Sequence, residues 1–334
     1  MASPGLSIAN SASNALSRPP LCALLIDISG TLLIGTTPTP GAAQSLARLR
    51  DAGVPFRFCS NTSQESTAEV CRRMREASME VLPGEVWTSV GAVNGVLKER
   101  DIRRPYMLLS SSARDECVDA GIRALHTNTS NYADDAAPYD AVIVGLAPSL
   151  LDYAHLNTAF RILVGEHDGA KRTEPSSVLK PALIALHKAQ YIQASDHALS
   201  LGPGPFVSAL EETAQTCALI VGKPTKLFFE MVIKSFGDEI VGEACGGKGG
   251  AQEPERQHIA VIGDDVSADL GEGAIELGLW RVLVKTGKYR QGDEMRRGVR
   301  SPDEVCDSFV DFVDRLLDQT LHERTNKKLT WVEG

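Results

Sequence analysis

The fold is decided by a segment near the start of the chain that reads Leu-Cys-Ala-Leu-Leu-Ile-Asp-Ile-Ser-Gly-Thr (residues 21–31). Six apolar residues in succession are typical of a strand that is buried on both faces of a parallel sheet. The run ends at Asp27, and a small polar turn follows it. The segment therefore predicts a buried parallel strand whose carboxyl end delivers a carboxylate.

Apolar runs of the same kind recur along the chain, and helical patterns separate them. The further runs lie at residues 54–59, 106–110, 141–145, 182–186, 218–222, 259–262 and 281–285. Helical spacing joins Leu46 to Leu49, then Tyr153, Leu156, Phe160 and Leu163, and finally Val305, Phe309, Phe312 and Leu316. Strands that alternate with helices predict an open, mostly parallel α/β sheet.

The composition is that of a globular protein of 334 residues with 43% hydrophobic residues and a net charge of −9. This length suits two modest domains, or one core domain with a large insertion. The negative charge argues against nucleic acid or an anionic membrane as a partner, and no apolar run approaches the ~20 residues that span a bilayer. Seven scattered cysteines without a C-x-x-C pair argue against a disulfide framework or a zinc site. We expect a reduced, cytoplasmic protein.

Three stretches are predicted to lack regular structure. Residues 1–19 are rich in Ser, Ala, Asn and Pro and are expected to form a disordered tail. Residues 165–177 and 242–257 are polar or glycine-rich and are expected to be surface loops. The segment 242–249 almost matches a P-loop, but it ends in glycine where a hydroxyl residue is required, so nucleotide binding is not expected there.

Polar residues follow four of the apolar runs, and ligands of an open α/β sheet bind beyond the carboxyl ends of its strands. The four clusters are Asp27-Ile28-Ser29-Gly30-Thr31, Ser60-Asn61-Thr62, Gly222-Lys223-Pro224 and Gly263-Asp264-Asp265 with Asp269. Mg²⁺ prefers hard oxygen ligands and keeps several waters, so one or two carboxylates and a backbone carbonyl suffice to hold it. We predict that Asp27 and Asp264 supply the carboxylates.

A phosphoryl group beside that cation needs positive charge and hydrogen-bond donors, for which Lys223, Ser60 and the N–H groups after Asp27 are the candidates. The Asp27 carboxylate can attack phosphorus and form an aspartyl-phosphate that water later hydrolyses. Asp269, one helical turn after Asp264, is placed to fix the lysine or a metal-bound water. Each cluster alone has an ordinary explanation as a turn, a helix cap or a solvated lysine. Four clusters in this order favour phosphoryl transfer.

The four clusters resemble the ordered motifs of the haloacid dehalogenase superfamily. The interval of about 160 residues between the second and third motifs resembles the branch with a large α/β (type IIA) cap inserted there. The segments 201–207 and 283–289 add to the likeness, which covers roughly residues 20–318. It implies a Rossmann-like core of residues 20–88 and 218–320, a cap of residues 89–217 and a C-terminal tail of residues 321–334.

The resemblance also implies a role for each motif residue. Asp27 is expected as nucleophile and metal ligand, Ser29 as a metal ligand through its carbonyl, and Asp264 as the third protein ligand of Mg²⁺. The residues expected to bind the phosphate are Asp27, Ile28, Ser29, Ser60, Asn61 and Lys223, with Asp265 and Asp269 in supporting positions. The turn His187-Lys188-Ala189 stands where such enzymes often place substrate-selecting residues, but we expect it to be an exposed polar turn.

One departure from the superfamily pattern bears on the substrate. Most of its phosphatases carry a second aspartate two residues after the nucleophile as general acid and base, and Ser29 stands there in this chain. Positioned acid–base catalysis contributes about 10²–10⁴-fold, so alkyl phosphate esters are expected to react slowly. We expect a small phosphorylated substrate of the phosphoramidate, pyrophosphate or aryl phosphate type. The alternative is a phospho-ligand-binding or scaffold protein with little turnover, and the cap is compatible with a homodimer.

Overall fold

The computed structural model describes residues 18–122, 139–167, 180–193, 198–237 and 258–330. Residues 1–17 of the expected tail, most of the 165–177 stretch and all of the 242–257 stretch lie outside the described residues. Among the described helices, none combines the length and the apolar character that crossing a bilayer requires.

The core is a six-stranded sheet in which every pairing is parallel. Its strands, in spatial order, are β14 (Glu304–Cys306), β13 (Trp280–Val284), β12 (Ile259–Gly263), β1 (Ala23–Asp27), β4 (Phe56–Ser60) and β5 (Val86–Thr88). All five residues of β1 are buried, because helices cover both faces of the sheet. The expected parallel-sheet α/β core is confirmed.

Alternate residues of β1 enter two different apolar clusters. Leu24 and Ile26 pack with the helices of one face, which are α1 (Ala42–Asp51), α2 (Thr67–Glu76) and α9 (Phe309–Thr330). Ala23 and Leu25 pack with those of the other, α7 (Lys226–Lys234) and α8 (Glu272–Glu276). Short elements complete this domain: β2 (Leu33–Ile34), β3 (Thr37–Pro38) and a 3₁₀ turn, η5 (Asp293–Met295). Two-faced burial is why the strand is continuously apolar.

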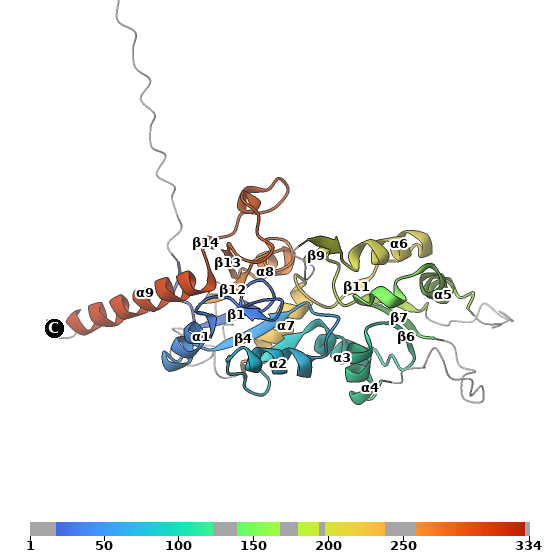
Figure 1. Cartoon of the computed structure of the whole chain (residues 1–334), viewed down its shortest axis with the longest axis horizontal. Coiled ribbons are helices and arrows are strands. Elements are labelled where there is room, and N and C mark those ends of the chain that lie inside the picture. Colours follow the sequence, from blue (N-terminus) through green and yellow to red (C-terminus); the bar gives the residue numbers. More distant parts are fainter. Residues whose placement is uncertain (1–17, 123–138, 168–179, 194–197, 238–257, 331–334) are drawn as a thin grey trace, which may run out of the picture.

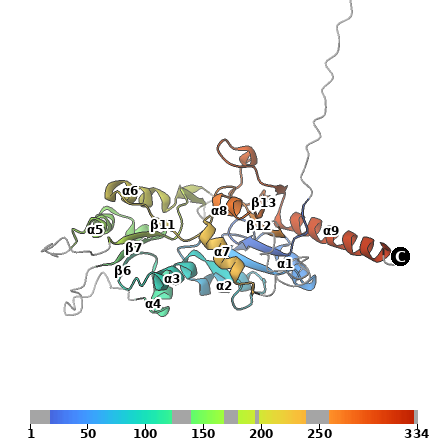
Figure 2. The same ribbon diagram turned by 180° about the vertical axis from the view of Figure 1, so that it is seen from behind.

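The inserted domain has its own parallel sheet of four strands, in the order β11 (Leu219–Ile220), β8 (Ala182–Ala185), β7 (Ala141–Val144) and β6 (Pro105–Leu108). Helices α3 (Ser89–Glu99) and α4 (Ser111–Asp119) pack on one face, and α5 (Tyr153–Val164) and α6 (Gly204–Ala214) on the other. A hairpin of β9 (Tyr191–Gln193) and β10 (Leu199–Leu201) and a 3₁₀ turn, η1 (Pro148–Leu150), complete it. Figures 1 and 2 show this domain lying beside the core, with α9 at the far end of the core.

Three expectations about the elements need correction. Residues 218–220 were assigned to the core, but Leu219 and Ile220 pair with β8 of the inserted domain. Val305 was placed on the last helix, but it pairs with Leu283 in β14, because α9 begins only after Ser308, whose hydroxyl accepts from the N–H of Asp311 (3.2 Å). The last helix also continues through the expected C-terminal tail to Thr330.

Candidate active site

Four segments that are far apart in the sequence meet at the carboxyl ends of the core strands. Asp27 is the last residue of β1 and Ser60 the last residue of β4, while Asp264 follows β12 directly. Lys223 lies between β11 and α7. Because these strands are parallel neighbours, their carboxyl ends lie at one edge of the sheet, where the sequence predicted a site.

The ammonium of Lys223 is surrounded by protein oxygens. Its Nζ donates to Oδ1 of Asp27 (2.5 Å), to Oδ1 of Asp269 (2.7 Å) and to the carbonyl of Cys59 (3.1 Å). Burial opposes the charge on this ammonium, but the carboxylates of Asp269 and Asp27 hold the pKa of Lys223 above its ordinary value. An ammonium has three N–H donors, and here all three are used within the protein.

The carboxylates of Asp27 and Asp264 are buried close to each other. Burial, reinforced by the charge of Asp269 and opposed by Lys223, raises the pKa of Asp27 to about 6. Burial and the charges of Asp269 and Asp27 raise the pKa of Asp264 well above its ordinary value. The hydroxyl of Thr31 donates to Oδ2 of Asp27 (3.0 Å). The pocket therefore concentrates negative charge that Lys223 only partly offsets.

A divalent cation fits this cluster of carboxylates. Asp27, Asp264 and Asp269 each offer a carboxylate oxygen, and these atoms lie within 4.8 Å of one another. Oδ2 of Asp264 accepts the backbone N–H of Lys288 (2.6 Å), whereas Oδ1 is buried and has no hydrogen-bond partner among the described residues. A buried carboxylate oxygen without a donor is costly, and a hard cation such as Mg²⁺ takes oxygen ligands of this kind. The donor set agrees with the expected magnesium site.

Asp269 and Asp265 have both structural and electrostatic roles. Oδ1 of Asp269 accepts from Lys223, and its Oδ2 accepts from the backbone N–H of Asp265 (3.1 Å). Both oxygens of Asp269 are thus bound by the protein. Oδ1 of Asp265 accepts from the N–H groups of Ser267 and Ala268 (2.9 Å each) and caps the turn after β12.

The remaining predicted residues contribute in different ways. Ile28 is fully buried in the core, so only its backbone is available to a ligand, while Ser29 is exposed. Ser60 is buried, and its Oγ accepts the N–H of Thr62 (3.2 Å). Asn61 was expected to bind phosphate, but both polar atoms of its amide bind the backbone of Lys223. Asn61 therefore acts on the lysine in this structure.

The loop after β13 also enters the site, although it was not among the predicted site residues. Thr286 donates its hydroxyl to the carbonyl of Gly30 (2.6 Å), and Lys288 donates its N–H to Asp264. A Cβ at Gly287 would lie 2.1 Å from Oδ2 of Asp264, so only glycine allows this approach. Burial lowers the pKa of Lys288, but the charges of Asp264 and Asp269 raise it above the ordinary value. The sequence does carry a signal for this loop, because it follows the apolar run at residues 281–285 as the other site loops follow theirs.

The inserted domain contributes His187 to the edge of the site. This residue is 4% exposed, so the expectation of an exposed turn is wrong. Its Nε2 lies 3.1 Å from Oγ of Ser63 in the core, and the same hydroxyl accepts the N–H of Leu146 (2.8 Å). Burial and the charges of Lys288 and Lys223 lower the pKa of His187 to about 3. His187 is buried because it packs on the core loop after β4, whereas Lys188 and Ala189 of the same turn are half-buried.

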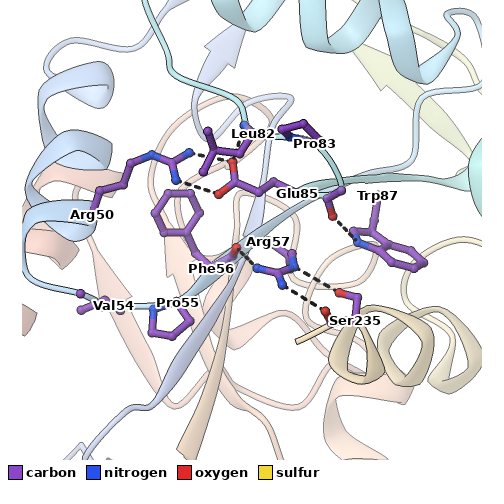
Figure 3. A pocket seen from close by; sticks show the side chains of 12 residues that line it. Arg50, Val54, Pro55, Phe56, Arg57, Leu82, Pro83, Glu85, Trp87 and Ser235 are labelled. Atoms are coloured by element: carbon purple, nitrogen blue, oxygen red, sulfur yellow. Dashed lines mark hydrogen bonds and ion pairs between the residues drawn. The ribbon is translucent and has the colours of Figure 1, made fainter. Parts of the chain in front are cut away.

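A separate cavity of about 650 Å³ lies at the opposite edge of the core sheet, at the start of β4 and β5 (Figure 3). Arg50 there pairs with Glu85 through two hydrogen bonds (2.8 and 2.7 Å). Arg57 donates to Ser235 and to the carbonyl of Phe56 (Figure 3). These polar groups are bound to one another, and among the described residues the carboxylate cluster lies at the other edge of the sheet, where we place the candidate active site.

Two family models match the chain, one on each side of the insertion. Residues 24–123 match the model described as haloacid dehalogenase-like hydrolase, and residues 220–312 match the model described as HAD-hydrolase-like. Human haloacid dehalogenase-like hydrolase domain-containing protein 2 is 38% identical over 301 residues, which cover 90% of this chain and 98% of that protein. Human phospholysine phosphohistidine inorganic pyrophosphate phosphatase is 30% identical, covering 88% of this chain and 93% of that protein.

Solved structures share the fold at low sequence identity. The 4-nitrophenylphosphatase from Thermotoga maritima superposes with a TM-score of 0.69 at 20% identity, covering 88% of this chain and 97% of that one. NagD from E. coli K-12 superposes with a TM-score of 0.66 at 18% identity, covering 88% of this chain and 98% of that one. The core and the inserted domain thus occur together in other proteins.

Proposed function

Because the chain belongs to the haloacid dehalogenase-like hydrolases, we propose that it is a magnesium-dependent phosphohydrolase that works through an aspartyl-phosphate. The observation that carries the proposal is the convergence of Asp27, Lys223 and Asp264 from three distant segments, with one oxygen of Asp264 buried and without a partner in the part of the chain that the structure describes. Buried carboxylates whose pKa values are raised by burial and by one another are typical of functional sites, and a carboxylate oxygen without a donor suits a metal ion.

Asp27 is the nucleophile in this proposal. An oxygen of its carboxylate attacks phosphorus, the bond to the leaving group breaks, and water then hydrolyses the aspartyl-phosphate. With a pKa of about 6 the group is mostly ionised at neutral pH. Lys223 and Thr31 hold its two oxygens, at 2.5 and 3.0 Å, and so fix the direction in which the carboxylate faces.

Asp27 and Asp264, with the backbone carbonyl of Ser29, would hold Mg²⁺. When bound, the ion supplies positive charge that offsets the charge of the carboxylates and of the phosphoryl oxygens. Asp269 stays bound to Lys223 and to the N–H of Asp265, so its part is to keep the lysine beside the nucleophile.

Ser29 directs the proposal toward leaving groups that need little protonation. A serine hydroxyl is a very poor acid near neutral pH, so the position that most phosphatases of the superfamily give to a general acid lacks one here. The names of two similar proteins specify phospholysine, phosphohistidine, pyrophosphate and 4-nitrophenyl phosphate. Those names support a preference for P–N, P–O–P or aryl phosphate bonds over alkyl esters.

The test is hydrolysis of pyrophosphate, imidodiphosphate, p-nitrophenyl phosphate and a sugar phosphate, each with and without Mg²⁺. We expect hydrolysis of the first three to depend on the metal and to be abolished in Asp27→Asn, which keeps the side-chain shape but removes the nucleophile. Sugar phosphate turning over as fast as pyrophosphate would refute the assigned preference. Absence of turnover on every phosphate, with Mg²⁺ binding intact, would instead support a phospho-ligand-binding protein, the alternative that Ser29 favours.

A further inference from the structure

Two lysines face the candidate site, and they differ in what their ammonium groups already bind. The ammonium of Lys223 donates its three N–H groups to Asp27, to Asp269 and to the carbonyl of Cys59. Within the described part of the chain, the ammonium of Lys288 has one ion-pair partner, Asp265, with Nζ 3.7 Å from Oδ2. That distance is too long for a hydrogen bond, so Lys288 still has donors for a ligand.

The backbone of Lys288 is fixed by the carboxylate cluster itself. Its N–H donates to Oδ2 of Asp264, and Thr286, two residues earlier, donates to the carbonyl of Gly30. Gly287 lies so close to Gly30 that an added Cβ would be 2.4 Å from the Cα of Gly30. The side chain of Lys288 thus starts from a fixed backbone position, and it is 22% exposed to solvent.

The charge of Lys288 acts both on the carboxylates of the core and on His187 of the inserted domain. It stabilises the ionised forms of Asp27 and Asp264, and it disfavours protonation of buried His187. Lys223 and Asp27 are both almost completely buried, whereas the side chain of Lys288 is partly exposed. A phosphoryl group at Asp27 would therefore have the rest of its molecule on the side where Lys288 stands.

We propose that Lys288 binds the leaving group and selects substrates whose leaving group departs as an anion, with the second phosphoryl group of a pyrophosphate as the best fit. This inference rests on the proposed phosphohydrolase function. As the bond from Asp27 to phosphorus forms, the bond from phosphorus to the bridging oxygen breaks and its electron pair stays on that oxygen. The departing phosphate is stabilised by the ammonium of Lys288, so no proton from position 29 is needed.

The proposed function does not distinguish P–O–P from P–N substrates, whereas this inference predicts that they depend differently on Lys288. Pyrophosphate gains from Lys288 because charge develops on the atom that leaves. An N-phosphorylated amine gains nothing, since its nitrogen departs as a neutral amine after taking up a proton. The two classes therefore separate in their response to loss of the ammonium.

The test replaces the lysine by an uncharged side chain of similar length. For Lys288→Met, we expect kcat/KM for pyrophosphate to fall about 100-fold and kcat/KM for phosphoramidate, which releases ammonia, to change less than about threefold. Lys285→Met is the matched control, because Lys285 is exposed and pairs with Asp307 (3.1 Å) outside the site. Lys288→Arg is expected to recover part of the pyrophosphate activity. Equal losses on both substrates, or no loss on pyrophosphate, would overturn the inference.

A binding measurement separates this inference from the proposed function, because it needs no turnover. Imidodiphosphate is titrated calorimetrically into Asp27→Asn protein in the presence of Mg²⁺, with and without Lys288→Met. We expect the lysine change to weaken binding at least about tenfold and Lys285→Met to leave it unchanged. Unchanged affinity in Lys288→Met would overturn the role of Lys288 even in an active phosphatase. If Lys288→Met weakens binding but the wild-type protein hydrolyses none of the phosphates, the proposed phosphohydrolase function is refuted and the role of Lys288 in binding stands.

Discussion

Asn61 holds the backbone of Lys223 from both sides. Its amide nitrogen donates to the carbonyl of Lys223 (2.9 Å), and its amide oxygen accepts the N–H of the same residue (2.8 Å). Gly222 packs against this amide so closely that an added Cβ would lie 2.5 Å from Oδ1 of Asn61. The position of the ammonium beside Asp27 therefore depends on the side chain of the residue that follows β4.

Truncating this amide should displace the lysine. We expect Asn61→Ala to lower kcat/KM about 100-fold, because a displacement of about 1 Å in a catalytic group costs that much. The loss should fall on kcat, with a smaller change in KM. Asn94→Ala is the control, since Asn94 is buried in α3 and its Oδ1 has no hydrogen-bond partner. Full activity in Asn61→Ala would mean that Lys223 is held by its ammonium contacts alone.

Removing the charge of Asp264 should raise the stability of the metal-free protein and abolish its stabilisation by Mg²⁺. Its Oδ1 is buried and has no partner within the described ranges, and burial and the charges of Asp269 and Asp27 raise its pKa. We expect Asp264→Asn to be more stable than the wild type without metal by about 1–3 kcal/mol. At about 100 times its dissociation constant, Mg²⁺ should stabilise the wild type by about 2.7 kcal/mol and this variant not at all.

Thermal unfolding with and without Mg²⁺ measures both effects of the Asp264 change. Asp307→Asn serves as the control, because Asp307 is largely exposed and lies outside the site. It should keep the full response to the metal. A normal magnesium response in Asp264→Asn would remove Asp264 from the metal site.

Burial of His187 should make the fold sensitive to mild acid. Its pKa is lowered from 6.5 to about 3. Between these pH values the imidazole is protonated in the unfolded chain and neutral in the folded chain. The stabilisation is present above pH 6.5 and is lost as the pH falls toward 3. Linkage gives a loss of about 2 kcal/mol between pH 7 and pH 5.

The contribution of His187 is measured by urea unfolding at pH 7 and pH 5. We expect His187→Gln to be less stable than the wild type at pH 7, because the buried ring packing is lost, but to lose about 2 kcal/mol less on acidification. His155→Gln, on α5 where the ring pairs with Asp152, should keep the wild-type pH dependence. Parallel stability curves for wild type and His187→Gln would contradict the burial of this ring.

Supplying a carboxylic acid at position 29 should broaden the substrate range. Ser29 is exposed, so an aspartate there meets no packing conflict. We expect Ser29→Asp to raise kcat/KM for glycerol 3-phosphate by about 10²-fold or more through general acid catalysis, with a much smaller change for pyrophosphate. Ser29→Asn has nearly the same shape and no acidic proton, and it should show no gain. An equal gain in both variants would attribute the effect to shape.

The strands of the core sheet could largely be predicted because both of their faces are buried. β1 and β12 are apolar along their length for this reason, and a run of that kind needs no knowledge of its neighbours. The site followed from the same runs, because their carboxyl ends lie along one edge. β5 and β14 have only three residues each and are interrupted by polar side chains, so no continuous run indicates them. Val305 was misassigned because its spacing to Phe309 and Phe312 happens to fit a helix.

Contacts between distant segments account for what the sequence did not predict at the site. Asn61 and Lys223 are 162 residues apart in the chain, and no local pattern indicates that the asparagine side chain binds the lysine backbone. The residues next to His187 in the sequence predict an ordinary polar turn. The ring is buried because the inserted domain packs on Ser63 of the core. The sequence does not predict the loop at Lys288, because its contacts with Asp264 are made by the backbone N–H of Lys288 and depend on the missing Cβ of Gly287.

The short strand β11 has a mechanical consequence. It belongs to the sheet of the inserted domain, and Lys223 follows it after only two residues. A rotation of the inserted domain against the core must bend the chain across Val221 and Gly222, next to the residue whose ammonium contacts the nucleophile. Any change in the angle between the two domains would therefore be transmitted to the counter-ion of Asp27 through a linker of two residues.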